Sequence, residues 1–273
     1  MPGEPPIIII DTVTKLGPEH KGTVLFGGSH GAVYAGYLAA KAKVHAVILN
    51  DAGVGKDQAG ISSLAFLDGI GMAAATVAHD TGRIGDGKDQ ATNGRISHVN
   101  KAAAAVGARA GMAAMDCARL MVKAKAPAGD APAYAEARFL LSDKPGEAKV
   151  WGIDSASLVK PEDAGTIVVT ASHGALLAGD AASAIKYDVL ACVFNDAGVG
   201  KDRVGIARLP ALDGRRIGAV TVDCMTARIG DARSTWETGS ISHANETAKA
   251  WGVKPGMSLP EFASLASQQG CRK

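Results

Sequence analysis

Aromatic residues are scarce in this chain and make up 4% of its 273 residues. The apolar content is nevertheless 47%, so a core has to be built mostly from Ala, Val, Ile and Leu. A chain of this length folds as one large domain or as two of ordinary size. The net charge is only +2, and no basic stripe carries interleaved aromatics. This composition argues against a nucleic-acid-binding protein.

Cysteine is also rare, and long apolar runs are absent. The four cysteines show no CxxC spacing, which argues against a structural zinc site; they are Cys117, Cys192, Cys224 and Cys271. The N-terminus lacks the basic start and long apolar run of a signal peptide. No uninterrupted apolar segment reaches the roughly 18 residues of a transmembrane helix. We therefore expect a cytoplasmic protein with reduced cysteines and no membrane partner.

What the chain does contain is a motif of eight residues that occurs twice. The segment 50–57 reads Asn-Asp-Ala-Gly-Val-Gly-Lys-Asp, and the segment 195–202 repeats it letter for letter. Shorter matches surround both copies: Ser29-His30-Gly31 with Ser172-His173-Gly174, and Arg83-Ile84-Gly85-Asp86 with Arg228-Ile229-Gly230-Asp231. Two copies at this period indicate a fused dimer with an internal duplication rather than a solenoid, which needs three or more repeats.

Each half reads as strands alternating with helices, and each motif follows an apolar run. This pattern predicts an α/β fold made of two tandem copies of a βαβαβα-type unit, with mainly parallel strands flanked by helices. A fused dimer further predicts a pseudo-two-fold axis between the copies. The expected parts are residues 1–125 as the first repeat, 126–149 as a connector and 150–273 as the second repeat. One continuous sheet and two separate lobes both remain open.

The expected elements follow the apolar runs and the Ala-rich segments. In the first repeat we expect strands at 7–10, 24–26, 45–49 and 73–77, and helices at 32–42, 60–68, 96–106 and 113–125. In the connector we expect one helical segment at about 134–141. In the second repeat we expect strands at 150–153, 166–170 and 219–222 and one before the motif. We expect a helix between the strand at 166–170 and the strand before the motif, a helix after the motif, and helices from 241 and at 259–266.

Polar residues follow the predicted strands of each repeat. Open α/β sheets bind ligands at the carboxyl ends of their strands, so we expect the loops at Ser29, Asn50 and Arg83 to lie close together. A second expected group at this edge is Ser97-His98 with its counterpart Ser242-His243, both predicted to begin helices. The strand-end loops are therefore the candidate site.

The loop 27–31 matches the G-x-S-x-G pattern of a nucleophile elbow. The second copy lacks the first glycine, and the hydrolase fold that carries this elbow has no such duplication. A more general interpretation is that Ser29 and Ser172 begin helices whose unpaired N–H groups bind an anion. Gly31 and Gly174 would then let a ligand approach the backbone. The alternative is that the serines are only helix caps.

The repeated motif resembles the end of a phosphate-binding loop, because Gly55-Lys56 follows another glycine. That pattern requires glycine at Asn50 and serine or threonine at Asp57, so we discard it. Asn50 and Asp51 directly follow a strand, which favours a functional role. For Lys56 and Asp57 the alternative is a turn with an internal ion pair.

We assign candidate roles by residue chemistry. His, Asp and Lys can move protons, Ser and Cys can act as nucleophiles, and the Arg fork can grip a carboxylate. The predicted catalytic residues are Ser29, His30, Asp51, Lys56, Ser172, His173, Asp196, Lys201 and Cys224. The predicted substrate-binding residues are Gly31, Asn50, Arg83, Gly174, Asn195 and Arg228. For the two arginines the alternative is an Arg–Asp pair that fastens the loop.

The two repeats differ after the third strand, where Cys224 stands at the position that holds His79 in the first copy. A strand-end cysteine can be activated by a neighbouring cation or a helix N-terminus. This divergence suggests that one repeat is specialised for chemistry.

Together these residues predict an enzyme that acts on a small polar, carboxylate-bearing molecule. The reaction that we favour is hydrolysis of a C–N bond, in an amide or cyclic amide, at or near the interface of the two repeats. A lyase or isomerase that moves a proton beside a carboxylate, a non-catalytic binding protein and a structural oligomer are the alternatives. No cofactor and no metal ligand is assigned. A divalent metal held by His30, His173 and the aspartates is a further possibility without supporting H-x-x-x-H spacing. The expected partners are an anionic small-molecule substrate and further copies in a homo-oligomer.

Overall fold

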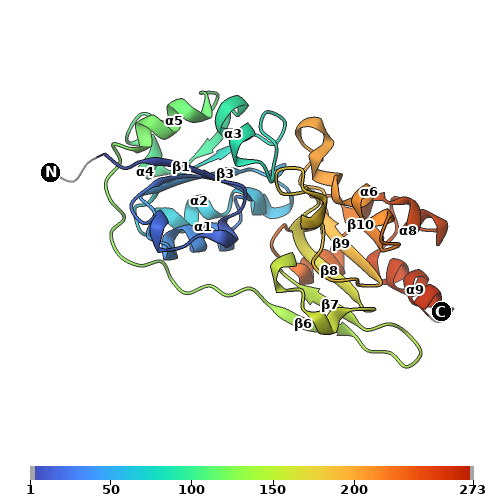
Figure 1. Cartoon of the computed structure of the whole chain (residues 1–273). Helices are drawn as coiled ribbons and strands as arrows, with labels where there is room; N and C mark the ends of the chain where they lie inside the picture. Colours follow the sequence, from blue (N-terminus) through green and yellow to red (C-terminus); the bar gives the residue numbers. More distant parts are fainter. Residues whose placement is uncertain (1–3, 271–273) are drawn as a thin grey trace. The chain divides into compact units, whose positions relative to one another are not determined.

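The computed structural model describes residues 4–270, which form two compact units. Unit 1 comprises the chain up to Val54, Gln58–Ala135 and Gly200–Asp202, and unit 2 comprises Gly55–Asp57, Glu136–Val199 and the chain from Arg203 onward. Each unit contains one mixed, mostly parallel sheet flanked by helices (Figure 1). The predicted α/β fold with two similar units is therefore confirmed, with a separate sheet in each unit.

The sheet of unit 1 has the order β1-β2-β3-β4-β5. Its four parallel strands are β1 (Ile7–Ile10), β2 (Val24–His30), β3 (Ala46–Asn50) and β4 (Ala73–Val77), and β5 (Ile96–Val99) is antiparallel to β4. The inner strands β2, β3 and β4 consist mostly of apolar residues because both faces of the sheet are covered.

Helices cover both faces of this sheet (Figure 1). The elements α1 (Val33–Lys41) and α2 (Ser63–Asp68) lie on one face, and α3 (Gly87–Asn93), α4 (Lys101–Ala104) and α5 (Ala114–Met121) lie on the other. Strand side chains alternate between the two faces. Leu25 and Val47 pack with α1 and α2, whereas Phe26 and Ile48 pack with the other set.

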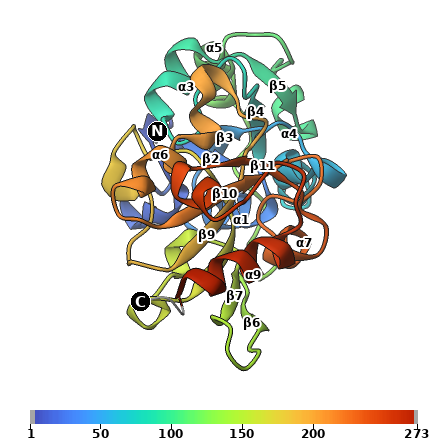
Figure 2. The same ribbon diagram turned by 90° about the vertical axis from the view of Figure 1, so that its right-hand side faces the viewer.

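The sheet of unit 2 has the order β11-β10-β9-β8-β7-β6. Its parallel strands are β7 (Val150–Ile153), β8 (Ile167–His173), β9 (Ala191–Asn195) and β10 (Gly218–Val222), and its antiparallel edges are β6 (Arg138–Ser142) and β11 (Ile241–Ala244). The helices are α6 (Arg208–Asp213), α7 (Ala232–Thr238), α8 (Glu246–Ala250) and α9 (Leu259–Gly270). Figure 2 shows α9 beside the strands of this unit, and its Phe262 and Ala266 belong to the core beneath it.

Two predicted helices are wrong in the same way. The segment predicted as a helix at 96–106 begins with β5, and the helix predicted from Ile241 begins with β11. In each case the β-branched start pairs antiparallel with the neighbouring strand. The helix starts only after Asn100 or Asn245, whose side chain caps it. The following alanines account for the helical pattern.

Two further helices are absent where we expected them. The connector segment predicted as helical around 134–141 contains β6, which pairs with β7. Between β8 and β9 there is only a short 3-10 turn, Ala181–Ser183. There Ala178 and Gly179 adopt left-handed backbone angles, with φ of 48° and 78°, which interrupt a right-handed helix.

The connector is divided between the two units after Ala135. In the part of the chain that the structure describes, no helix is long and apolar enough to cross a membrane.

Candidate functional site

Three loops meet at the carboxyl end of the parallel strands of unit 1. The Gly31 N–H donates to the Asn50 carbonyl at 2.7 Å, the Asn50 side-chain amide donates to the Gly82 carbonyl at 3.0 Å, and the Gly85 N–H donates to the Gly28 carbonyl at 2.7 Å. Unit 2 repeats these bonds between Gly174 and Asn195 at 2.8 Å, Asn195 and Ala227 at 3.1 Å, and Gly230 and Ala171 at 2.9 Å. The predicted proximity of the loops is confirmed in both units.

The repeated motif begins with a left-handed turn. In unit 1 the φ angles of Ala52, Gly53 and Val54 are 48°, 76° and 61°, and the counterparts Ala197, Gly198 and Val199 have 50°, 72° and 62°. A left-handed β-branched residue costs about 1–3 kcal/mol and is typical of functional sites. The turn is held by the side chains before it, because Asn50 accepts from the Ala52 N–H and Asp51 from the Gly53 N–H.

Asp51 holds an imidazole at this strand end. Its Oδ1 accepts from His79 Nδ1 at 2.9 Å and from the His79 N–H at 3.0 Å. The carboxylate is 4% exposed and the imidazole 31%. Burial alone would raise the pKa of Asp51, but the hydrogen bond and the charge of His79, followed by Ser97 and the Gly53 N–H, outweigh burial and hold the pKa below its ordinary value. The site therefore contains an ionised carboxylate beneath a half-buried histidine.

His79 was not among the predicted site residues. The sequence feature that could have identified His79 is its position directly after a strand, where the two repeats differ. With Nδ1 donating to Asp51, the neutral imidazole of His79 carries its lone pair on Nε2.

In unit 2 a cysteine takes the place of His79. Asp196 Oδ1 accepts from the Cys224 N–H at 3.0 Å, as Asp51 does from the His79 N–H. Burial, and then the negative charges of Asp196 and Asp223, raise the pKa of the Cys224 thiol to about 12. Catalytic cysteines have the opposite environment, since a nearby cation stabilises their thiolate. This environment opposes the predicted nucleophilic role of Cys224.

The same residues form a group with metal-ligand chemistry. One ligand atom from each of Asp196, Asp223 and Cys224 lies within 4.8 Å of the others, and the group is largely buried. Two carboxylates and a thiol are donors that Zn²⁺ accepts. His30 and His173, named above as an alternative pair of metal ligands, are not part of this group.

The two predicted nucleophilic serines fasten turns. Ser29 accepts from the Val13 N–H at 3.1 Å, and Ser172 accepts from the Ala156 N–H at 2.9 Å. Both lie within strands, and α1 begins only at Val33. The prediction that the serines begin helices is therefore wrong, and with it the expected anion site at a first helical turn.

The neighbouring histidines and glycines also have local partners. Nδ1 of His30 accepts from the Ala32 N–H, and Nδ1 of His173 from the Ala175 N–H, both at 3.3 Å. Burial lowers the pKa of His30 to about 4, so it is neutral at neutral pH. A Cβ on Gly31 would meet the Gly60 carbonyl at 2.5 Å. The group that closely approaches this glycine is therefore the backbone of Gly60, where we had expected a ligand.

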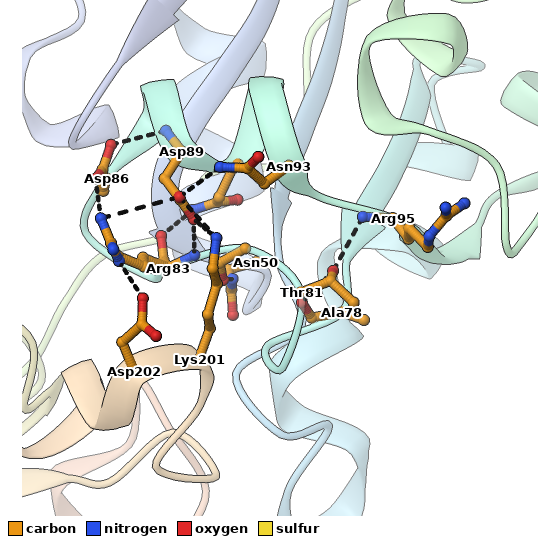
Figure 3. A network of polar contacts seen from close by, with 12 residues as sticks. Asn50, Ala78, Thr81, Arg83, Asp86, Asp89, Asn93, Arg95, Lys201 and Asp202 are labelled. Carbon is orange, nitrogen blue, oxygen red and sulfur yellow. Dashed lines mark hydrogen bonds and ion pairs between the residues drawn. The ribbon is translucent and has the colours of Figure 1, made fainter.

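The segment Gly200–Asp202 brings a lysine into unit 1 (Figure 3). Lys201 Nζ lies 2.8 and 2.9 Å from the two carboxylate oxygens of Asp89, and the Lys201 N–H donates to the His79 carbonyl at 2.8 Å. Asp202 pairs with Arg83 Nε at 2.7 Å. Arg83 also lies near Asp86 and Asp89.

Unit 2 receives Lys56 in the same way, with a different partner. The Lys56 N–H donates to the Cys224 carbonyl at 2.8 Å, but Lys56 Nζ donates to the Thr238 hydroxyl at 2.8 Å. Arg228 pairs with Asp231 at 2.7 Å and with Asp57 at 3.1 Å. Both arginines therefore make the Arg–Asp pairs that were the alternative to substrate binding.

Ser97 and Ser242, expected to begin helices, lie in β5 and β11. Ser97 Oγ lies 3.0 Å from Thr76 Oγ1, and Ser242 Oγ lies 3.0 Å from Thr221 Oγ1. Ser97 also helps to lower the pKa of Asp51, so this strand does reach the candidate site.

No protein-family model, curated protein or solved structure matches this chain. Its function has to be argued from the residues of the site.

Proposed function

We propose that this protein is an enzyme that hydrolyses a C–N bond, in an amide or cyclic amide, of a small polar molecule that bears a carboxylate. The observation that carries the proposal is the Asp51–His79 pair, with its 2.9 Å contact at the carboxyl end of parallel strands. A buried carboxylate that orients a half-buried imidazole is the arrangement of a general base.

In the proposed reaction His79 Nε2 removes a proton from water as the water oxygen attacks the carbonyl carbon. Asp51 stabilises the imidazolium that forms, as the aspartate of a Ser-His-Asp triad does. The C–N bond then breaks, and the imidazolium returns the proton to the departing nitrogen. Unit 2 has Cys224 in place of this histidine and so lacks the imidazole of the pair, and we therefore assign the chemistry to unit 1.

Arg83 supports a carboxylate-bearing substrate. Its side chain is 41% exposed, and that of its closest partner, Asp202, is 53% exposed. Exposed ion pairs contribute little to stability, typically about 0–1 kcal/mol. A substrate carboxylate can therefore replace Asp202 at the guanidinium and bind it through two parallel hydrogen bonds.

The test is hydrolysis in H₂¹⁸O of a panel of N-acyl amino acids, ureido acids and cyclic amides that carry a carboxylate. A hydrolase places one ¹⁸O atom in the new carboxyl group. A lyase or isomerase using the same base would instead exchange a carbon-bound hydrogen in D₂O, and a binding protein would retain its ligand unchanged.

We expect Asp51→Asn and His79→Gln each to lower kcat/KM by about 100-fold or more, the usual contribution of a general base. The matched control is Asp196→Asn, which alters the same position of the motif beside Cys224 and should retain most activity. Equal losses in Asp51→Asn and Asp196→Asn, or full activity in His79→Gln, would contradict the proposal.

A second candidate function is metal-dependent hydrolysis in unit 2, favoured by the Asp196, Asp223 and Cys224 group. We propose that these residues bind a divalent cation such as Zn²⁺, which would supply a Lewis acid and lower the pKa of bound water. Metal analysis of the purified protein should find one ion per chain, lost in Asp223→Asn and retained in Asp51→Asn. A metal-free protein that takes up no Zn²⁺ would exclude this candidate.

A homo-oligomer and a cytoplasmic location remain predictions. Light scattering during size-exclusion chromatography measures the first, and cell fractionation measures the second.

A further inference from the structure

Unit 1 has a cavity at the opposite end of its sheet from the Asp51–His79 pair. The cavity has a volume of about 450 Å³ and lies where β2, β3 and β4 begin. Its apolar wall is formed by Ala40, Val44, Ile70 and Pro127. The connector closes one side, because the Ala128 N–H donates to the Ile70 carbonyl at 2.8 Å. This volume lies within the range of small-molecule sites, roughly 300–1,000 Å³.

The polar lining of this cavity is mainly basic. Lys21, Lys43 and His45 line it, and Asp130 is its one acidic lining residue. A neighbouring cavity of about 420 Å³ shares both lysines and adds Lys41. His45 Nε2 is buried without a hydrogen-bond partner. An unpaired buried polar atom is costly and calls for an explanation. A ligand oxygen would supply the missing partner.

The second repeat shows that the fold does not require these basic groups. The Gly22 N–H donates to the Lys43 carbonyl at 2.9 Å, and the equivalent bond of unit 2 joins Gly165 to Asp188 at 3.1 Å. Lys43 therefore corresponds to Asp188. Ala164, which precedes Gly165, takes the place of Lys21.

His45 has an equally clear counterpart. Its N–H donates to the Thr23 carbonyl at 2.7 Å, and in unit 2 the Leu190 N–H donates to the Thr166 carbonyl at 2.9 Å. A leucine thus occupies the position of the unpartnered imidazole and packs against the core. All three basic groups are special to unit 1.

We propose that this cavity binds a small organic anion, with its carboxylate or phosphate group between Lys21, Lys43 and His45 and its apolar part against the wall. The site is separate from the proposed catalytic pair and does not depend on the proposed function. Asp130 lies 3.6 Å from Lys43, and both side chains are largely exposed. Because an exposed ion pair is weak, the ligand anion displaces Asp130.

Phenyl phosphate is a suitable probe, since it joins an anion to an apolar ring. Titration into ¹⁵N-labelled full-length protein should shift the amide signals of residues 21–23, 43–45 and 126–130 in a saturable way. Phenol should cause no such shifts, and inorganic phosphate should bind more weakly because it lacks the apolar part. Asp51→Asn should leave the binding unchanged, which separates this site from the catalytic one.

Lys21→Gln and Lys43→Asn should each weaken binding by about 10-fold, the effect of a lost charge-assisted hydrogen bond. Asparagine suits position 43 because Lys43 has a left-handed φ of 56°. His45→Leu, the residue of the second repeat, should also weaken binding without lowering the melting temperature. Lys88→Gln, an exposed change on α3, is the control and should bind normally.

Absence of saturable binding in the millimolar range would overturn the proposal. So would shifts centred on His79, or affinities unaffected by all three substitutions in the cavity.

Discussion

Replacing Asn50 by alanine is expected to lower the free energy of unfolding of unit 1 by about 3 kcal/mol. Asn50 is fully buried, donates to the Gly82 carbonyl at 3.0 Å and accepts from the Ala52 N–H at 2.9 Å. Alanine leaves both backbone groups buried without partners, at about 1–3 kcal/mol each. The lost side chain also leaves a small cavity, which adds to the cost.

The chain contains its own control for this experiment. Asn195 makes the same two bonds, to Ala227 at 3.1 Å and from Ala197 at 2.9 Å. Asn195→Ala should therefore cost unit 2 a similar amount. All three tryptophans, Trp151, Trp236 and Trp251, belong to unit 2.

These tryptophans allow the two units to be followed separately during urea unfolding. Tryptophan fluorescence reports unit 2, and far-UV circular dichroism reports both units. Asn195→Ala should move the fluorescence transition to lower urea, whereas the direct effect of Asn50→Ala should appear in the circular dichroism. A change below about 1 kcal/mol in either variant, the scale of a single ordinary hydrogen bond, would refute the bridging role of these asparagines.

Replacing Lys201 by methionine is expected to destabilise unit 1 by about 2–3 kcal/mol, because it removes the closest cationic partner of a buried carboxylate. The Asp89 side chain is 7% exposed and receives both short contacts from Lys201 Nζ (Figure 3). Its remaining contacts compensate only in part: hydrogen bonds from the Arg83 N–H and Asn93, and the Arg83 guanidinium at 3.9 Å. The matched variant Lys56→Met removes bonds to the Thr238 hydroxyl and the Thr226 carbonyl, which leaves no buried charge unpaired, and should cost only about 1 kcal/mol.

The loss of stability caused by Lys201→Met should depend on pH in a defined direction. Burial alone would raise the pKa of Asp89, but hydrogen bonds from Lys201 and the Arg83 N–H outweigh burial and hold the pKa below its ordinary value. A carboxyl whose folded pKa is depressed stabilises the fold above its unfolded pKa, about 3.9 for Asp, and loses this contribution as pH falls through the folded pKa. The difference between wild type and Lys201→Met should therefore be largest near neutral pH and shrink in acid.

Urea titrations at several pH values would measure this trend. A difference that does not change with pH would show that packing of the lysine stem, rather than its charge, stabilises this contact.

Much of the parallel sheet could be predicted because its strands are short runs of apolar residues, largely β-branched or alanine. The ends of β1, β4 and β7 lie where we expected them. The three-loop arrangement was also predictable, since parallel strands bring their carboxyl ends to one edge.

The edge strands were not predictable in the same way. β5 and β11 are stabilised by pairing with a neighbouring strand, while the alanines after them favour a helix. The short helices α3 and α7 were also missed, although Asp86 and Asp231 cap them.

The residues of the candidate site were likewise predictable only in part. Asn50 and Asp51 could be identified from the repeated motif at a strand end. The pairing of Asp51 with His79 and of Lys201 with Asp89 depends on tertiary folding, which local sequence does not encode. Ser29 looked like a nucleophile because its glycine neighbours suggested a turn, but those residues continue the strand.

The exchange of short segments between the units affects when unit 1 can complete its folding during synthesis. Unit 1 includes Gly200–Asp202, and unit 2 includes Gly55–Asp57. Nascent domains generally fold as units, N-terminal first, as the ribosome releases them. Here the carboxylate of Asp89 binds Lys201, which is translated more than a hundred codons after it. An N-terminal fragment ending at Ala135 would thus emerge from the ribosome with Asp89 bound to Arg83 and Asn93 but without its closest cation, Lys201, and the first half of the gene does not encode all the contacts of unit 1.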